Sequence, residues 1–216
     1  MSGAVRDGVS SPLRDAVERV RAGGLVGYPT ETVWGLGADA CSESAVAKLR
    51  RWKGRGEDAP ISVLVDAVSA LEALECEPRR SAGRLADAFW PGPLTLVLRC
   101  ARRFAEGVAR RDGAVGLRCS SHPVAKAFAE ALARAGAGPV TATSLNHSGV
   151  PAARTASEAR ALCAAPGDPT LLEDGPDAGA SPASTVVDLT GARPVVLRWG
   201  ALSRDALAPW LEEASA

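Results

Sequence analysis

Short apolar runs alternate with amphipathic stretches along most of this chain, and that alternation is typical of an α/β protein. Runs such as 25–28 and 94–98 are short and bounded by Gly or Pro, which predicts buried strands. Leu13, Val17 and Val20 recur at helical spacing and predict a helix before the first strand. The complete set of predicted strands is 25–28, 61–65, 94–98, 114–118, 139–143, 170–173, 185–189 and 195–198.

Capping residues mark the ends of several predicted helices. Ser42 supplies an N-cap, and Gly54 ends the same helix because glycine accepts the left-handed conformation of a C-cap. Further N-caps are predicted at Ser11, Thr155 and Ser203. The interpretation is therefore a series of short helices between strands.

The sequence predicts a single domain. Its 216 residues contain no internal repeat and no long linker, so we expect one domain over 11–213 after a flexible leader at 1–10. The expected fold class is α/β, with a twisted, open, mixed sheet and flanking helices.

The loop after the first predicted strand carries candidate chemistry. Pro29 ends that strand, and Thr30, Glu31 and Thr32 then place two hydroxyls and a carboxylate beyond a strand end. Ligand crevices of open α/β sheets lie at such positions. A polar turn is the alternative for this motif alone, and Glu31 could either stabilise the loop through backbone N–H groups or take part directly. The glycines at 35 and 37 permit positive φ or close approach of the backbone to a ligand.

Composition narrows the choice of function. Lys+Arg and Asp+Glu balance at 25 each, so no global field favours a nucleic-acid or membrane partner. No apolar run is long enough to span a bilayer, and we expect a cytoplasmic protein. The five cysteines are scattered without a C-x-x-C pair, which favours free thiols over zinc ligation or disulfides. The chain also lacks a nucleophile-elbow signature for a Ser–His–Asp triad.

Cations and hydroxyls follow many of the predicted elements. Lysine is rare in this sequence. Lys53, which precedes Gly54, is therefore a candidate for a role that needs an ammonium group. Cations with hydroxyl donors suit a polyphosphate, and an arginine can hold a carboxylate through two hydrogen bonds. The set therefore suits a nucleotide together with a small acid. Its members are Thr30, Glu31, Thr32, Lys53, Arg55, Arg118, Ser144, Asn146, Ser148, Ser184, Thr185 and Arg198.

Six collinear motifs between residues 13 and 202 resemble the YrdC/TsaC family of threonylcarbamoyl-adenylate synthases. They are Y-P-T-E-T-V-W-G-L-G, K-G-R, P-G-P-L-T, V-G-L-R-x-x-x-H-P, T-S-L-N-H-S-G and S-T-V-V-D-L. The resemblance is to the short, single-domain form, and it implies a YrdC-like fold with a concave ligand face. It also implies a nucleotidyltransferase that condenses L-threonine, bicarbonate and ATP, with Mg²⁺, into threonylcarbamoyl-AMP and pyrophosphate. A partner transferase complex would then modify tRNA.

The resemblance assigns roles by matching position. Lys53 and Arg55 are the implied catalytic residues and face the ATP phosphates. Ser144, Asn146 and Arg198 are implied to contact ATP as well. Thr32, Arg118 and Ser184 are implied to hold threonine, with Arg118 on its carboxylate. No metal ligand is assigned.

Several residues depart from the family pattern. Ala59 stands where an Asn often does, and Leu64 where some members carry a threonine-binding His, so no role is assigned there. Trp34 replaces the usual Tyr. The bulk of Leu145 and Trp199 is expected to bear on the pocket and therefore on substrate identity.

Two alternative functions stay open at this point. The first is an RNA-binding module that contacts tRNA or double-stranded RNA through a basic rim of Arg102, Arg103, Arg110 and Arg111. The balanced charge and the scarcity of aromatic residues weigh against it. The second is a carbamoyl-adenylate former that acts on a different substrate.

Overall fold

The strands of this chain form two mixed sheets. The computed structural model describes residues 10–54, 56, 60–77 and 80–213. One sheet has the strand order β6-β2-β1-β7 and the other β3-β5-β4-β8-β9, and each contains parallel and antiparallel pairs. The α/β class and the mixed pairing are therefore confirmed. The division into two sheets was not foreseen, because an apolar run indicates that a strand is buried without identifying its neighbour.

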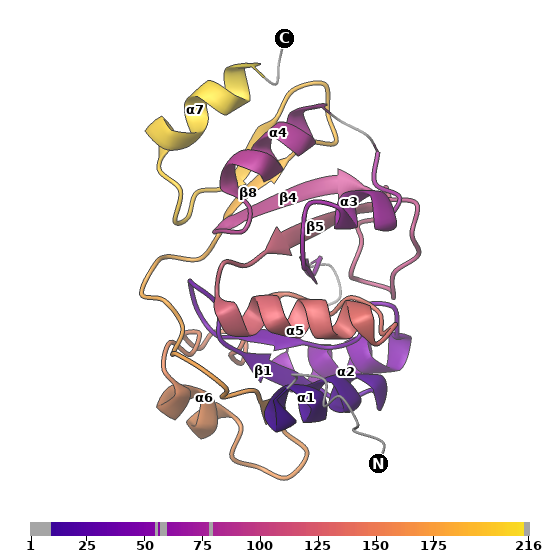
Figure 1. Cartoon of the computed structure of the whole chain (residues 1–216), viewed down its shortest axis with the longest axis vertical. Helices are drawn as coiled ribbons and strands as arrows, with labels where there is room; N and C mark the ends of the chain where they lie inside the picture. Colours follow the sequence, from indigo (N-terminus) through magenta and orange to yellow (C-terminus); the bar gives the residue numbers. More distant parts are fainter. Residues whose placement is uncertain (1–9, 55, 57–59, 78–79, 214–216) are drawn as a thin grey trace, which may run out of the picture.

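The four-stranded sheet lies in the lower part of the molecule in Figure 1. Helix α5 packs against α1, and residues of both helices share a buried cluster with Val26 and Tyr28 of β1. The strands are β1 (Val26–Tyr28), β2 (Gly35–Gly37), β6 (Thr143–Ser144) and β7 (Thr170–Leu171). The helices of this part are α1 (Ser11–Arg21), α2 (Glu43–Lys53), α5 (Pro123–Arg134) and α6 (Ala156–Leu162).

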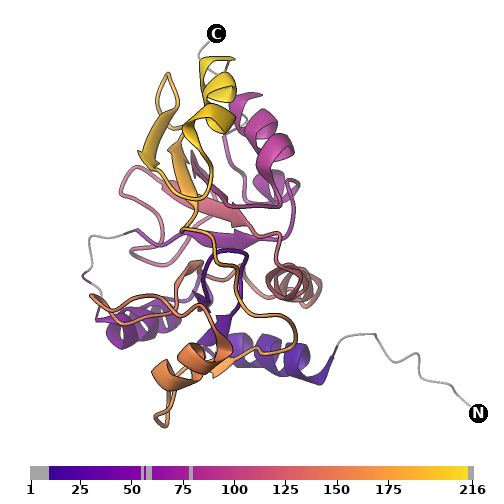
Figure 2. The same ribbon diagram turned by 90° about the vertical axis from the view of Figure 1, so that its left-hand side faces the viewer.

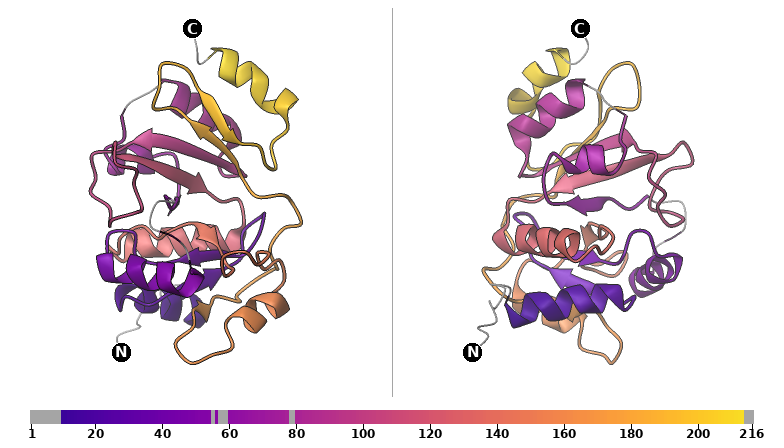
Figure 3. Two further views of the ribbon diagram at one scale, coloured as in Figure 1. Left: turned by 180° about the vertical axis from the view of Figure 1, so that it is seen from behind. Right: turned by 45° about the vertical axis from the view of Figure 1, so that its right-hand side comes forward.

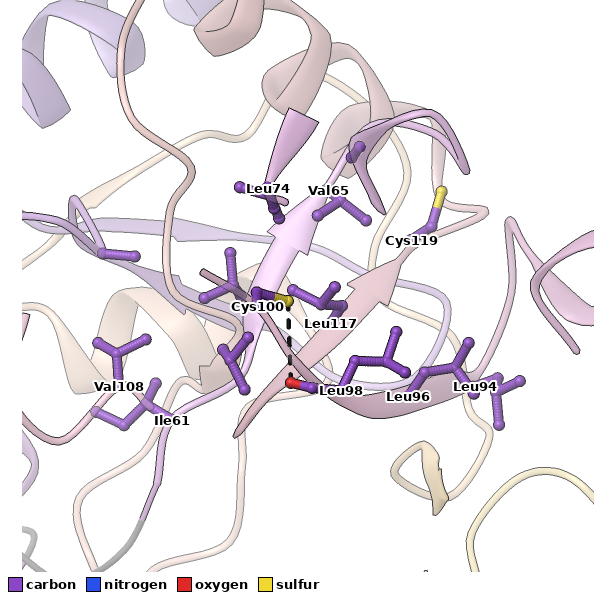
Figure 4. Close-up of a cluster of buried hydrophobic side chains, with 14 of the residues drawn as sticks. Ile61, Val65, Leu74, Leu94, Leu96, Leu98, Cys100, Val108, Leu117 and Cys119 are labelled. Atoms are coloured by element: carbon purple, nitrogen blue, oxygen red, sulfur yellow. Dashed lines mark hydrogen bonds between the residues drawn. The ribbon is translucent and has the colours of Figure 1, made fainter. Parts of the chain in front are cut away.

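The five-stranded sheet lies in the upper part, and Figure 2 shows α4 and α7 beside it at the end that is farthest from α1. Its strands are β3 (Val63–Val65), β4 (Leu94–Arg99), β5 (Ala114–Cys119), β8 (Thr185–Asp188) and β9 (Val195–Arg198). The helices are α3 (Ala70–Ala73), α4 (Arg80–Phe89) and α7 (Arg204–Glu213). Leu94, Leu96 and Leu98 of β4 gather with Leu117 of β5 in the buried cluster of Figure 4. Alternate residues of a strand share a face, so β4 presents these leucines to one side of the sheet.

The predicted caps are largely confirmed. Ser42 accepts a hydrogen bond from the Ala45 amide, and Gly54 takes the left-handed conformation with φ of 62°. The cap of α1 is one residue earlier than predicted: Ser10, not Ser11, accepts from the Leu13 amide. Pro12 fits inside the first helical turn because the N–H that it lacks would have no partner there.

The prediction for residues 35–37 was wrong. These residues form strand β2 and pair with β1, whereas the sequence suggested a loop. Neither Gly35 nor Gly37 has positive φ. Glycine is required at 35 for a different reason, since a Cβ there would lie 2.8 Å from the Tyr28 ring. This close approach is to a side chain of the protein, whereas the sequence suggested close approach to a ligand.

The cysteine prediction was also partly wrong. Cys76 and Cys100 form a disulfide, while Cys41, Cys119 and Cys163 are free thiols. An isolated β-bridge brings the two paired residues together although they are 24 positions apart in sequence. The Cys100 sulfur also lies near the Leu98 carbonyl oxygen in the cluster of Figure 4.

One long segment joins the two parts of the molecule. Residues 172–184 run from β7 in the lower sheet to β8 in the upper sheet, along one side of the molecule in Figure 3. Gly179 donates its amide to the Thr30 carbonyl, 2.9 Å away. A Cβ at Gly179 would collide with the Glu31 carbonyl oxygen. This segment therefore packs directly on the loop that follows β1.

None of the helices in the described part of the chain is long and apolar enough to cross a membrane.

Candidate functional site

A cavity of about 350 Å³ lies between the two sheets. The four-stranded sheet contributes Tyr28, Gly35 and Ser144, and the five-stranded sheet contributes residues from every one of its strands. The lining residues that bear hydroxyl or guanidinium groups are Tyr28, Thr30, Thr32, Ser62, Thr95, Arg110, Arg118, Thr143, Ser144, Ser184 and Arg198. A cavity with this lining can surround a ligand that has many oxygen acceptors.

The floor of the cavity is one row across the five-stranded sheet. Arg118 of β5 lies between Leu64 of β3 and Thr95 of β4. Thr95 in turn lies beside Val186 of β8, and Val186 lies beside Arg198 of β9. All five residues line the cavity. Sheet register thus places two arginines on the same row, about three strand spacings or ~15 Å apart along the backbone.

Hydroxyl groups lie between these two arginines. The Ser184 hydroxyl is 2.9 Å from that of Thr95, and Arg198 Nη2 donates to it over 3.1 Å. Arg198 also donates Nε and Nη2 to the Ser184 carbonyl, at 3.1 and 2.9 Å. Ser184 is therefore held by both neighbouring strands and has a fixed position at the cavity.

Arg118 is paired with a carboxylate from the opposite sheet. Its Nη2 donates to Glu31 Oε1 over 2.8 Å, and the Ser120 hydroxyl donates to Glu31 Oε2. The side chains of Arg118 and Glu31 are only 8% and 18% exposed. Burial alone would raise the pKa of Glu31, but the charge of Arg118 and the Ser120 hydrogen bond bring that pKa below its ordinary value. Glu31 is therefore ionised at neutral pH.

Arg118 keeps donors for a ligand. It lines the cavity, and Glu31 accepts from Nη2 of a guanidinium that has five N–H donors. The Nε of Arg118 has no hydrogen-bond partner among the described residues, but it is fully buried and does not itself face the cavity. The pKa of Arg198 is lowered, first by burial and then by the charge of Arg118. Both observations favour an anionic ligand, which would accept from Arg118 and offset the repulsion between the arginines.

Lys53 lies behind Ser144. At the last position of α2 it is 3% exposed, and its ammonium group donates to the Ser144 carbonyl at 2.5 Å. It also donates to the Asn146 carbonyl and side-chain oxygens, each at 3.0 Å. Asn146 Oδ1 further accepts from the Ser144 hydroxyl at 2.6 Å. The lysine, the serine and the asparagine thus form one hydrogen-bonded unit.

The predicted site residues divide into three groups. Thr32, Arg118, Ser144, Ser184 and Arg198 all line the cavity. Lys53 and Asn146 contact Ser144 from outside the described lining. Arg55 and Ala59 lie outside the described residues.

The departures from the family motifs fall in different places. Leu64 and Trp34 line the cavity, and the Trp34 indole N–H is buried without a partner among the described residues. Leu145 is fully buried in the core and does not line the cavity, and neither does Trp199. Trp199 packs instead under the Arg204 guanidinium, 4.8 Å from the ring centroid. Neither side chain lines the cavity, so the effect of their bulk on its shape, which stays a prediction, would be exerted through the neighbouring lining residues Ser144 and Arg198.

Sequence reasoning assigned no role to Thr95 or Ser120, placed Arg110 only in the basic rim of the RNA-binding alternative, and left Glu31 undecided. Thr95 stood inside the P-G-P-L-T motif, which was the available signal. Arg110 lines the cavity and donates to Asp188 at 2.6 Å and to Asp112 at 2.7 Å. The chain positions of these residues do not show that β5, β8 and the loop after β1 meet at one cavity.

The described residues supply no ready-made metal site. They contain no group of three His, Cys, Asp or Glu side chains that could hold an ion. The described cavity lining also contains no carboxylate. Mg²⁺ commonly takes only one or two carboxylates and completes its shell with waters and substrate phosphates.

A family model for Sua5, YciO and YrdC proteins, described as telomere recombination, matches residues 18–200. This chain belongs to that family. A relative from Mycobacterium tuberculosis is 42% identical over 201 residues, which make up 92% of this chain and 88% of that protein. The resemblance inferred from the six motifs is therefore confirmed.

Two further comparisons connect the family to an activity. A Pyrococcus abyssi protein named threonylcarbamoyl-AMP synthase is 37% identical over 190 residues, which cover 88% of this chain and 54% of that protein. The crystal structure of Sua5 from P. abyssi in complex with L-threonine aligns with a TM-score of 0.82 and 34% identity, over 93% of this chain and 57% of that one. This chain therefore spans little more than half of the archaeal proteins and most of the mycobacterial one.

Proposed function

We propose that this Sua5/YciO/YrdC family member is a threonylcarbamoyl-AMP synthase. It would condense L-threonine, bicarbonate and ATP into threonylcarbamoyl-AMP and pyrophosphate, for transfer to tRNA by a partner transferase complex. The observation that carries the proposal is the row of cross-strand neighbours that aligns Arg118, Thr95 and Arg198 on the cavity floor. Its donors suit two anions held side by side.

Threonine would bind at the Arg118 end of the row. Arg118 lines the cavity and would hold the threonine carboxylate with the guanidinium donors that Glu31 does not occupy. Thr32 and Ser184 line the same cavity and offer hydroxyls to its polar groups. A leucine at position 64, next to Arg118 in register, gives this end an apolar wall.

ATP would bind where Arg198 and the Lys53–Ser144–Asn146 unit approach the cavity. Ser144 lines it directly, and Lys53 fixes the loop that carries Ser144. Arg55, two positions after Lys53, is predicted from the K-G-R motif to face the phosphates. Mg²⁺ enters this proposal as the counter-ion that accompanies the phosphates, where it would neutralise charge on the leaving pyrophosphate.

The chemistry would proceed by positioning and charge neutralisation. The threonine amine reacts with bicarbonate to form a carbamate, with loss of water. A carbamate oxygen then attacks the α-phosphorus of ATP, and the bond to pyrophosphate breaks. The fixed donors of Arg118, Ser184 and Arg198 would reduce the repulsion between the carbamate and the phosphates. No side chain has to form a covalent bond.

The test is pyrophosphate release from ATP with Mg²⁺, compared with reactions that omit threonine or bicarbonate. We expect release only when both are present. In Lys53→Met, which keeps an unbranched apolar side chain but removes the ammonium, we expect release to fall about 100-fold. Glu173→Gln, which breaks an exposed ion pair with Arg160 away from the cavity, is the matched control and should retain full activity.

Each remaining outcome of that test has a distinct meaning. Release that needs bicarbonate but not threonine would point to a different acceptor amine. ATP binding without release would contradict the proposal. A basic RNA-binding rim has weaker support, because Arg110 is paired with Asp112 and Asp188.

A further inference from the structure

Glu31 joins the two halves of the site. It belongs to the loop that follows β1 of the four-stranded sheet, and its partners Arg118 and Ser120 lie on and just after β5 of the five-stranded sheet. The neighbouring residue Thr32 lines the cavity from the same loop. A single carboxylate therefore connects the loop that carries one candidate threonine contact to the strand that carries another.

Both oxygens of this carboxylate are already used. Oε1 accepts from Arg118 and Oε2 accepts from Ser120, and the Glu31 side chain is not among the described residues that line the cavity. Arg118, by contrast, lines the cavity, and Glu31 accepts only from its Nη2. The arginine therefore faces the cavity in which a ligand would bind, and the glutamate contacts the arginine.

The position of Arg118 would be poorly defined without Glu31. Arg198 shares the cavity floor, and its positive charge is close enough to Arg118 to contribute to a lowered Arg198 pKa. A buried guanidinium that has lost its carboxylate is both desolvated and repelled by that neighbour. It would turn toward water or toward other acceptors, and its donors would leave the orientation that the cavity requires.

We propose that Glu31 is a positioning residue for amino-acid binding: it fixes the guanidinium of Arg118 and, through its own loop, the hydroxyl of Thr32. This inference rests on the proposed function, in which those two residues hold threonine. Glu31 does not touch the substrate and does not exchange a proton with it. The effect of Glu31 on threonine is exerted entirely through its neighbours.

A double-mutant cycle tests this directly. The proteins are the wild type, Glu31→Gln, Arg118→Gln and the double variant, assayed for pyrophosphate release with threonine and ATP varied separately. In Glu31→Gln the KM for threonine should rise about 10- to 100-fold, because a misplacement near 1 Å costs about that much. The KM for ATP should change less than about twofold, since the nucleotide residues do not contact Glu31.

The cycle separates an indirect role from a direct one. If Glu31 acts through Arg118, then Glu31→Gln should have little further effect in the Arg118→Gln background. Equal losses in both backgrounds would show that Glu31 acts independently of Arg118 and would overturn the proposal. An unchanged KM for threonine in Glu31→Gln would overturn it as well.

Two measurements keep the test valid if a variant folds poorly or if the proposed reaction is absent. Ser120→Ala removes one hydrogen bond to Glu31 without burying a charge, and it should raise the KM for threonine several-fold. An unchanged KM would count against the proposal.

The thermal shift that threonine induces reports binding without turnover. A wild-type protein that shows no such shift and no release would refute the proposed function, whereas a shift that Glu31→Gln leaves intact would refute only the positioning role.

Discussion

At the scale of single residues, the site depends on which guanidinium donors are occupied. Glu31 accepts from Arg118 Nη2, and the other guanidinium donors that face the cavity are left for a ligand. A lysine in place of Arg118 would keep the charge but lose the planar arrangement of donors. We therefore predict that Arg118→Lys raises the KM for threonine about 10- to 100-fold and leaves the KM for ATP almost unchanged. Steady-state kinetics with each substrate varied would measure both, and an equal rise in both values would contradict the assignment.

The Glu31 carboxylate also predicts a pH dependence of stability. Burial tends to raise its pKa, but Arg118 and Ser120 lower it below the value of an unfolded glutamate. The unfolded state therefore binds the proton first as pH falls, so the ion pair stabilises the fold fully above an ordinary glutamate pKa of about 4.3. That stabilisation is lost as pH falls through the lower pKa of the folded state.

The measurement is urea unfolding of the wild type and Glu31→Gln across pH. The difference between their free energies of unfolding should stay constant from about pH 6 to 8 and shrink below about pH 4.3. A difference that instead disappears near neutral pH would show that Glu31 is protonated there.

At the scale of elements, close backbone packing positions the loop after β1. A Cβ at Gly179 would collide with the Glu31 carbonyl oxygen, so Gly179→Ala should displace that loop and cost about 1–3 kcal/mol of stability. The KM for threonine should rise in parallel. Gly83 in α4 is the matched control, because nothing lies within 4 Å of a Cβ placed there. Gly83→Ala should be neutral or stabilise the protein by up to about 1 kcal/mol, and similar losses in the two variants would refute the packing argument.

The junction between α2 and β6 supports a further prediction. Lys53 holds Ser144 and Asn146 through buried hydrogen bonds, each worth about 1.5–3 kcal/mol when one partner is charged. Lys53→Met should therefore expose the backbone of 144–150 to faster hydrogen exchange while α5 exchanges as in the wild type. If residues 144–150 were as well protected from hydrogen exchange in the variant as in the wild type, the order of this segment would not depend on the lysine.

The sequence predicted the helix caps better than it predicted which strands and cysteines pair. Ser42, Gly54 and the Thr155–Glu158 capping box act within one turn of chain, and the structure has each of them as the sequence predicts. The pairing of β2 with β1 and the Cys76–Cys100 disulfide depend on which distant segments meet, and no local pattern encodes that. The same limit applied to the site. Arg118 and Ser184 could be selected by motif, but the bond from Glu31 to Arg118 required the fold.

At the scale of the whole molecule, the cavity exists only because two sheets face each other. The nucleotide residues proposed here come from both sheets, and Glu31 fastens one sheet to the other beside the proposed threonine site. Substrates that must react with each other are therefore expected to meet at this boundary. We propose that threonine, the carbon of bicarbonate and the AMP group of ATP are linked covalently within this single cavity.

The most direct measurement of that claim is mass spectrometry of the reaction products with ¹³C-bicarbonate and ¹⁵N-threonine as labelled substrates. We expect an AMP adduct that carries both labels and forms in equal amount to the pyrophosphate released, and that disappears in Arg118→Lys at limiting threonine. An adduct without the threonine label, or pyrophosphate without any adduct, would contradict the proposed reaction.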